Sequence, residues 1–265
     1  MTELTAPPVA RGPHPRTDDK LVISIRGAGH YLQVIDDGDV LPSLNDRLDL
    51  VCREKFRRID RFIQLALLGS AECVRGRALA PDCALYICSG SGPVGTNIAV
   101  QEAIVGSRVL PTPFHFVNTL GSSAGFYVAR NLSLAGQSLF ISRRGDNFSA
   151  GLACVATDLA AGAVSQALLG FVEECSLPLS AHRSRQLLPA DALVAEGSHW
   201  LLLERFRRDG THVAVHVPQE AGAGRHDSTD AAQVTALALN APAGTFGFAP
   251  GGSGAWNLVR LGADG

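Results

Sequence analysis

The sequence has 265 residues, a formal net charge of −2, 46% apolar residues, 28 glycines and only 18% charged residues. This composition is typical of a compact α/β protein with tight turns and argues against a disordered chain. The near-neutral charge provides no basic field for a phosphate backbone, and the arginine-rich segments 53–61 and 205–208 are short and interrupted. The composition therefore argues against a nucleic-acid partner.

The sequence contains no segment typical of export or of a membrane span. Residues 1–20 are rich in proline and charge without an apolar core, and no later run of about 18 uncharged apolar residues exists. We therefore expect a cytoplasmic protein without membrane contact and with a flexible tail at residues 1–20. The cysteines at positions 52, 73, 83, 88, 154 and 175 lack metal-ligand spacing. They are expected to be reduced core residues, without disulfides, metal or cofactor.

The first half of the chain alternates strand patterns with helical ones. A β-rich run at residues 21–25 predicts a central strand. Apolar residues at helical spacing predict a core-facing helix over residues 56–74, with Asp60 near its start. A buried strand at 84–88 is then expected to lead through the glycine turn 89–95 into a helix over 98–104.

The second half predicts a helix over residues 118–130, a strand at 139–142 and a further helix after Gly145. Asp146 or Asn147 is expected to cap that helix by accepting backbone N–H bonds. Four of its apolar residues share one face: Phe148, Leu152, Val155 and Leu159. The remaining predicted elements are buried strands at 167–172 and 200–203, an edge strand at 211–217, and a surface loop at 244–254 closed by a short strand at 257–261.

Four segments resemble segments of the N-terminal half of β-ketoacyl synthases in amino-acid sequence, and they occur in the same order. They are Ile59–Leu67, which contains Asp-Arg-Phe-Ile-Gln; Pro113–Leu120; Gly136–Ser138; and Ala195–Glu204, which ends in Leu-Leu-Leu-Glu. The resemblance runs from Leu21 to Val217. It implies an α/β fold of the thiolase-like, ketosynthase type, in which a layered mixed sheet carries helices on both faces. The implied domain spans residues 21–220, and residues 221–265 form a short C-terminal extension in place of the family's second half.

The resemblance also implies that the catalytic nucleophile is missing. Counting from Gly136 without a gap, the position of the family's nucleophilic cysteine falls on Gly145, and Gly162 falls on the glycine that ends the next helix. A ketosynthase condensation needs a thiol that becomes a thioester, and glycine has no side chain to provide it. The family's two catalytic histidines belong to the absent second half, so His212, His216 and His226 receive no catalytic role.

Other motifs have simpler explanations. Residues 90–95 spell G-x-G-x-x-G after a strand, but no acidic residue follows at the end of the next strand, so a dinucleotide site is disfavoured. Cys88 and Cys154 are expected to pack in the core, since Cys154 lies well inside a helix. Ser122 and Ser123 lie in a small-residue run that favours close helix packing.

The resemblance implies a chain-length factor, the non-catalytic partner of an active ketosynthase in type II polyketide, polyene or fatty-acyl biosynthesis. The expected heterodimer brings acyl carrier protein in only indirectly, through the catalytic subunit. The residues expected to form the acyl tunnel or the interface are Phe114, His115, Phe116, Val94, Ser122 and Phe140. Two alternatives stay open: a free-standing acyltransferase or thioesterase that uses another Cys or Ser, and a homodimeric scaffold that binds a carrier protein.

Overall fold

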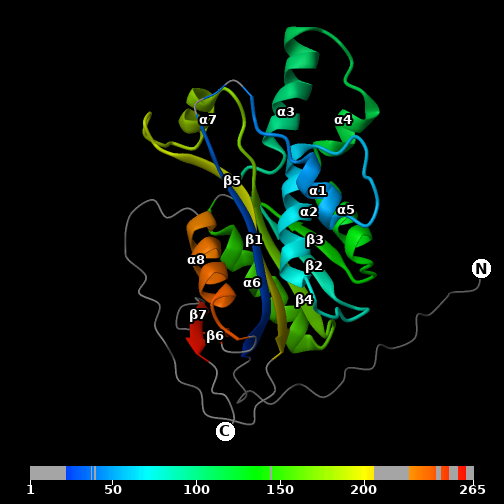
Figure 1. Cartoon of the computed structure of the whole chain (residues 1–265), viewed down its shortest axis with the longest axis vertical. Helices are drawn as coiled ribbons and strands as arrows, with labels where there is room; N and C mark the ends of the chain where they lie inside the picture. The colour runs from blue at the N-terminus through cyan, green and yellow to red at the C-terminus, as the bar shows by residue number, and fades with distance from the viewer. Residues whose placement is uncertain are drawn as a thin grey trace, which may run out of the picture.

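The computed structural model describes residues 22–36, 38, 40–143, 145–205, 227–242, 246–250 and 256–260. These residues form a mixed sheet with helices on both faces (Figure 1). The strands are β1 (Ile23–Ile35), β2 (Ala84–Cys88), β3 (Ser138–Ile141), β4 (Gln166–Glu173), β5 (Val194–Arg205), β6 (Phe246–Pro250) and β7 (Trp256–Arg260). The helices are α1 (Asn45–Val51), α2 (Arg61–Val74), α3 (Val94–Gln101), the π-helical turn η1 (Glu102–Gly106), α4 (Pro113–Asn118), α5 (Ser122–Leu132), α6 (Asn147–Ala161), α7 (Leu179–Arg185) and α8 (Asp227–Leu239).

The sheet has seven strands in the order β3-β2-β4-β5-β1-β6-β7. Strand β2 runs parallel to its neighbours β3 and β4, whereas β5 runs antiparallel to β4 and β1. Strand β1 therefore lies inside the sheet, as the sequence predicted, and β3 forms one edge. Because the carboxyl ends of parallel strands meet at the same sheet edge, the turns after β2, β3 and β4 gather at one end of the molecule.

Two buried cores sandwich the sheet. Helices α2 and α5 cover one face, where Phe62, Leu65 and Trp200 are fully buried. Helices α6 and α8 cover the other face (Figure 1). The four residues predicted to share one face of the helix after Gly145 are all buried there: Phe148, Leu152, Val155 and Leu159. The predicted face of α6 is therefore confirmed.

Glycines let the largest core side chain enter the sheet. A Cβ on Gly170 of β4 would lie 2.6 Å from three ring atoms of Trp200 on the neighbouring strand β5. A Cβ on Gly69 of α2 would lie 2.6 Å from Cδ1 of the same indole ring. The indole thus fills the space that two missing side chains leave, as close packing of a protein interior requires.

Several predicted boundaries differ from the structure. The first strand continues to Ile35, the helix expected from residue 56 begins at Arg61, and the helix expected over 98–104 starts at Val94 and ends in η1. The helix expected over 118–130 is α5, which runs from Ser122 to Leu132, and Asn118 is the last residue of the separate helix α4. The surface loop expected over 244–254 is wrong at residues 246–250, where β6 pairs with β1 and β7, and the rest of that range lies outside the described residues. The predicted strand 211–217 lies outside the described residues.

The described residues contain neither a candidate membrane span nor a candidate metal-binding cluster. None of the helices there combines the length and the apolar character that a bilayer span requires. No cluster of three His, Cys, Asp or Glu side chains within the described ranges has the geometry to hold a metal ion. None of the six cysteines forms a disulfide.

Candidate functional site

The β3–α6 junction has the strand–turn–helix form that the sequence predicted, but its turn is left-handed. Gly145 has φ +78° and Asp146 has φ +55°, and no atom lies within 4 Å of a Cβ placed on Gly145. Asp146 is the N-cap of α6, yet its side chain makes no capping hydrogen bond. Instead, Asn147 Oδ1 accepts from the Arg143 N–H at 2.6 Å and Nδ2 donates to the Arg143 carbonyl at 3.0 Å. The side chain of Asn147 therefore holds the turn, and Gly145 supplies a backbone conformation that other residues rarely adopt.

Four cysteine thiols have raised pKa values. Burial raises the pKa of Cys73 and Cys83 to about 12, and that of Cys52 and Cys175 to about 11. Such thiols stay protonated at neutral pH and are poor nucleophiles. Cys154 packs against the core on the α6 face of the sheet, as expected.

Two of the predicted tunnel residues, Phe114 and His115 of α4, line a pocket of about 500 Å³. Its other walls come from Thr112, Asn118, Thr96 and the segment Arg58–Asp60. The guanidinium carbon of Arg58 lies 4.6 Å from the centre of the Phe114 ring, and Asn118 Nδ2 donates to the Arg58 carbonyl at 2.9 Å. These contacts tie α4 to the chain that leads into α2.

The other predicted residues lie apart from that pocket. Phe116 is exposed on α4, Ser122 is exposed at the start of α5, and Val94 is partly buried at the start of α3. Phe140 points from β3 into the core, where its ring meets the ring of Phe62 edge-on at 6.1 Å. The structure thus brings Phe114 and His115 together and leaves Phe140 among core residues.

A second pocket, of about 480 Å³, shares Thr96 and His115 with the first. Its apolar wall consists of Val40, Leu41, Ile98, Ala99 and Leu177, and its polar wall consists of Arg61, Gly95, Glu174, Cys175 and Ser176. Sequence reasoning missed this pocket. The pair Glu173-Glu174 at the end of a buried strand was the available signal, because buried carboxylates are rare.

These two carboxylates hold the glycine turn after β2. Glu173 accepts hydrogen bonds from the backbone N–H groups of Gly90 and Ser91 and, at 3.1 Å, from the Ser89 hydroxyl. Glu174 accepts from the Gly95 N–H at 2.5 Å. A dinucleotide phosphate needs such N–H groups unpaired, but here they are paired with the side chains of Glu173 and Glu174. The geometry therefore agrees with the sequence argument against a dinucleotide site.

Burial also changes the acidity of this region. It raises the pKa of Glu174 to about 8, and the negative charges of the nearby Asp60 and Glu196 also raise this pKa. Asp60 caps α2 by accepting from the Ile63 N–H at 2.9 Å, and its other oxygen accepts from the Thr96 hydroxyl at 2.9 Å. Glu174 is therefore a protonated, hydrogen-bonding group in the pocket wall at neutral pH.

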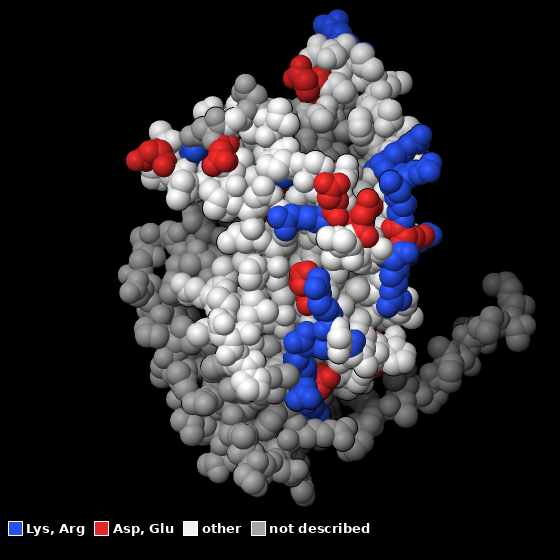
Figure 2. Space-filling model, in the orientation of Figure 1, with Lys and Arg blue, Asp and Glu red and all other residues white. Residues whose placement is uncertain are grey.

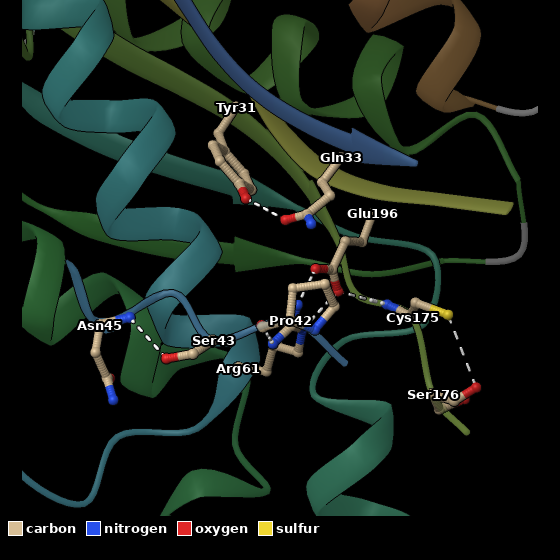
Figure 3. A network of polar contacts seen from close by, with 9 residues as sticks. All are labelled: Tyr31, Gln33, Pro42, Ser43, Asn45, Arg61, Cys175, Ser176 and Glu196. Atoms are coloured by element: carbon tan, nitrogen blue, oxygen red, sulfur yellow. Dashed lines mark hydrogen bonds and ion pairs between the residues drawn. The ribbon is translucent and has the colours of Figure 1, made fainter. Parts of the chain in front are cut away.

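One buried ion pair joins this region to the sheet (Figure 3). Arg61 binds both carboxylate oxygens of Glu196, with Nε 2.7 Å from Oε2, and its Nη1 donates to the Pro42 carbonyl at 2.8 Å. The Cys175 N–H donates to the same carboxylate at 3.3 Å. Arg61 thereby holds β5, the start of α2 and the segment after β4 in one arrangement.

Five large apolar side chains in β3, which is an edge strand of the sheet, and in or next to α4 and α5 are exposed. They are Leu139 of β3, Phe126 of α5, and Phe116, Val117 and Leu120 in and after α4. We call these five residues the β3-edge surface. Charged side chains are more mixed: on the face drawn in Figure 2, Lys and Arg form a broken line with acidic side chains among them.

Comparisons with protein families and with curated proteins find no match. Solved structures do match. The chain aligns with a chain of "Ketosynthase (ApeO) in Complex with its Chain Length Factor (ApeC)" from Xenorhabdus doucetiae, at a TM-score of 0.57 and 14% identity, covering 91% of this chain and 100% of that one.

Two further solved structures are similar. The ishigamide ketosynthase/chain length factor matches at a TM-score of 0.55 and 15% identity over 71% of this chain, and a β-ketoacyl synthase from Burkholderia phymatum STM815 matches at 0.53 and 16% over 70%. The chain covers 59% of each of these two longer chains. Likeness at such low identity shows the fold, and the chain therefore has the thiolase-like fold of ketosynthases, as its sequence predicted.

Proposed function

We propose that this protein is a non-catalytic ketosynthase-like subunit, a chain-length factor, which pairs with an active ketosynthase in polyketide, polyene or fatty-acyl biosynthesis. Two features of the chain support the absence of condensing activity. Glycine occupies the position of the nucleophile, and its φ of +78° belongs to a backbone conformation in which a cysteine would be strained. The buried thiols elsewhere have raised pKa values. The partner ketosynthase would then carry out all bond formation.

The β3-edge surface is the observation that carries the pairing. Leu139, Phe126 and Phe116 are 44%, 59% and 63% exposed, respectively, although apolar side chains of this size usually find a partner when they cluster. They flank a sheet edge whose outer backbone groups have no strand partner among the described residues. An uncovered apolar edge favours association with another chain. A ketosynthase subunit of the same fold offers a matching edge for a pseudo-two-fold heterodimer.

The matched complexes agree with this size and role. The chain aligned in the ApeO–ApeC complex is covered completely by this one, so a chain of about this length takes part in a complex of a ketosynthase with its chain length factor. The ishigamide structure is also a ketosynthase/chain length factor. These descriptions belong to those proteins, and they are the basis for proposing the same kind of partner here.

Phe114 and His115 would set the product length. Both belong to α4, which lies with α3 at the projecting end of the molecule (Figure 1), and both line the 500 Å³ pocket. An acyl chain that crosses from the partner's active site would end against them. Since the size of a side chain in the pocket wall limits the chain that fits, a larger or smaller side chain at position 115 should change where chain growth stops.

The pairing is tested by affinity capture of the chain co-expressed with a tagged catalytic ketosynthase from the same source. Phe126→Asp places a charge on the β3-edge surface and should weaken capture by about 30-fold or more, since a central interface residue contributes about 2 kcal/mol. Leu193→Asp is the matched control, because Leu193 is also highly exposed but lies before β5, away from this surface. Equal capture of both variants would contradict the proposed surface. Capture of the chain only by its own copies would favour the homodimeric scaffold.

A further inference from the structure

A buried carboxyl group in the wall of the second pocket has one oxygen without a protein partner. Glu174 lies directly after β4, is only 3% exposed and lines the pocket. Its Oε1 accepts the N–H of Gly95, in the first turn of α3, at 2.5 Å. The other oxygen, Oε2, has no hydrogen-bond partner among the described residues, yet protein atoms do not fully enclose it. Oε2 is therefore free to bind water or a ligand in the pocket.

The surroundings of Glu174 keep its carboxyl group protonated. Burial raises its pKa to about 8, and the negative charges of Asp60 and Glu196 add to this effect, whereas the Gly95 hydrogen bond and Arg61 act against it. At neutral pH the group is therefore mostly neutral. Because Oε1 accepts the Gly95 N–H, the proton of the neutral carboxyl lies on Oε2. The pocket wall thus presents a hydrogen-bond donor.

The other charged groups of this region are already paired. Arg61 binds both carboxylate oxygens of Glu196 (Figure 3). Asp60 uses one oxygen for the Ile63 N–H and the other for the Thr96 hydroxyl. A carboxylate ligand would lose its water here without gaining the charge of Arg61, and it would approach two acidic side chains. The pairing therefore favours a neutral ligand.

The remaining lining of the second pocket is largely apolar. It includes Val40, Leu41, Ile98, Ala99 and Leu177. The volume of about 480 Å³ is in the range of sites for small organic molecules. The pocket shares Thr96 and His115 with the first pocket, so a chain held in one pocket lies beside the other. An aliphatic chain that carries one hydrogen-bond-accepting oxygen fits this combination of apolar wall and single donor.

We infer that the second pocket holds an acyl chain by a neutral oxygen of that chain, such as a ketone carbonyl, which accepts a hydrogen bond from Glu174. The inference deepens the proposed function and rests on it for the acyl nature of the ligand. A fully reduced chain would make only apolar contacts in this pocket. The pocket therefore favours acyl chains that retain a carbonyl oxygen, and it requires no catalytic group.

Calorimetric titration of the isolated full-length protein with octan-2-one, a neutral ketone on an aliphatic chain, tests this inference. At about pH 7 octan-2-one should bind, and octanoate should bind about 10-fold more weakly or less, since its charge finds no partner. Glu174→Gln keeps both the acceptor and the donor and should bind octan-2-one like the wild type. Glu174→Met removes the donor at similar volume and should weaken binding about 10-fold, the contribution of one hydrogen bond.

A pH series separates Glu174 from the other titratable or charged groups around the pocket. These groups are Asp60, Arg61, His115, Cys175 and Glu196. The affinity of the wild type for octan-2-one should fall about 10-fold between about pH 7 and 9.5, because Glu174 loses its proton over this range. Glu174→Gln should show no such fall. Glu173→Gln is the matched control, since Glu173 is the neighbouring carboxyl but does not line the pocket, and it should keep the fall.

Three results would overturn the inference: no binding of octan-2-one to the folded wild type, binding of octanoate as tight as that of octan-2-one, or a fall with pH that persists in Glu174→Gln. Thermal melting shows whether each variant is folded, and the wild-type pH series needs no variant. Capture of a ketosynthase by a chain that does not bind octan-2-one would overturn this inference and leave the proposed pairing intact. Binding of octan-2-one with the predicted pH dependence, by a chain that captures no ketosynthase, would support the pocket assignment and refute the pairing.

Discussion

Replacing Arg61 by methionine should destabilise the protein strongly. The Glu196 side chain is 0% exposed and the Arg61 side chain only 16%. Without Arg61, the Glu196 carboxylate keeps only the N–H of Cys175 as a described partner. Leaving a buried charge unpaired costs about 3–5 kcal/mol. At about 2–4 °C per kcal/mol for a protein of this size class, Tm should fall by roughly 6–20 °C in a calorimetric or circular-dichroism melt.

Two variants make this prediction refutable. Arg75→Met removes an exposed ion pair with Glu72, in which the arginine side chain is 68% exposed, and should lower the free energy of unfolding by less than about 1 kcal/mol. The double variant Arg61→Met/Glu196→Met should recover much of the loss, because it removes the unpaired charge as well. If the Tm of Arg61→Met equalled that of the wild type, or if Arg75→Met lowered Tm as much as Arg61→Met does, the buried pair would not contribute the stability assigned to it.

Three further predictions concern pH, packing and product. The pKa of Glu174, raised to about 8 in the folded state, means that this group makes the free energy of unfolding fall as pH rises from about 4.5 to 8. The free energy of unfolding of Glu174→Gln, measured in urea titrations, should therefore rise by about 2–3 kcal/mol relative to that of the wild type between pH 5.5 and 7.5. A difference between the two proteins that does not change with pH would contradict the raised pKa. Gly170→Ala should cost about 1–3 kcal/mol through overlap with Trp200, and an unchanged urea midpoint would refute this. In the ketosynthase complex, His115→Trp should shorten and His115→Ala lengthen the products seen by mass spectrometry; unchanged products would reject the tunnel-end role.

Much of the fold could be predicted from local pattern. Continuous apolar runs identified β2 and β4, and helical spacing identified α2 and the buried face of α6. Asp60 was recognised near a helix start, and it is the N-cap, with Ile63 as donor. These features depend on neighbours within a few residues, which is the range over which sequence patterns are informative.

Other features depended on contacts that no local pattern reveals. The β-rich run at residues 21–25 predicted a short strand, whereas β1 continues to Ile35, and a side chain at Gly29 within it would overlap the backbone of Cys73 in α2. Gly121 separates α4 from α5 where a side chain would overlap the ring of Phe140. The second pocket combines Val40, Arg61 and Glu174, which only the folded sheet brings together. Close approach and long-range assembly thus account for most differences between prediction and structure.

Light scattering on the protein co-expressed with a catalytic ketosynthase from the same source tests the central proposal most directly. The account predicts a species with the mass of one copy of each chain, or a whole multiple of that pair, which is lost with Phe126→Asp and kept with Leu193→Asp. A chain that remains alone, or that forms only homodimers while the ketosynthase elutes separately, would contradict the assignment as the partner subunit of a ketosynthase.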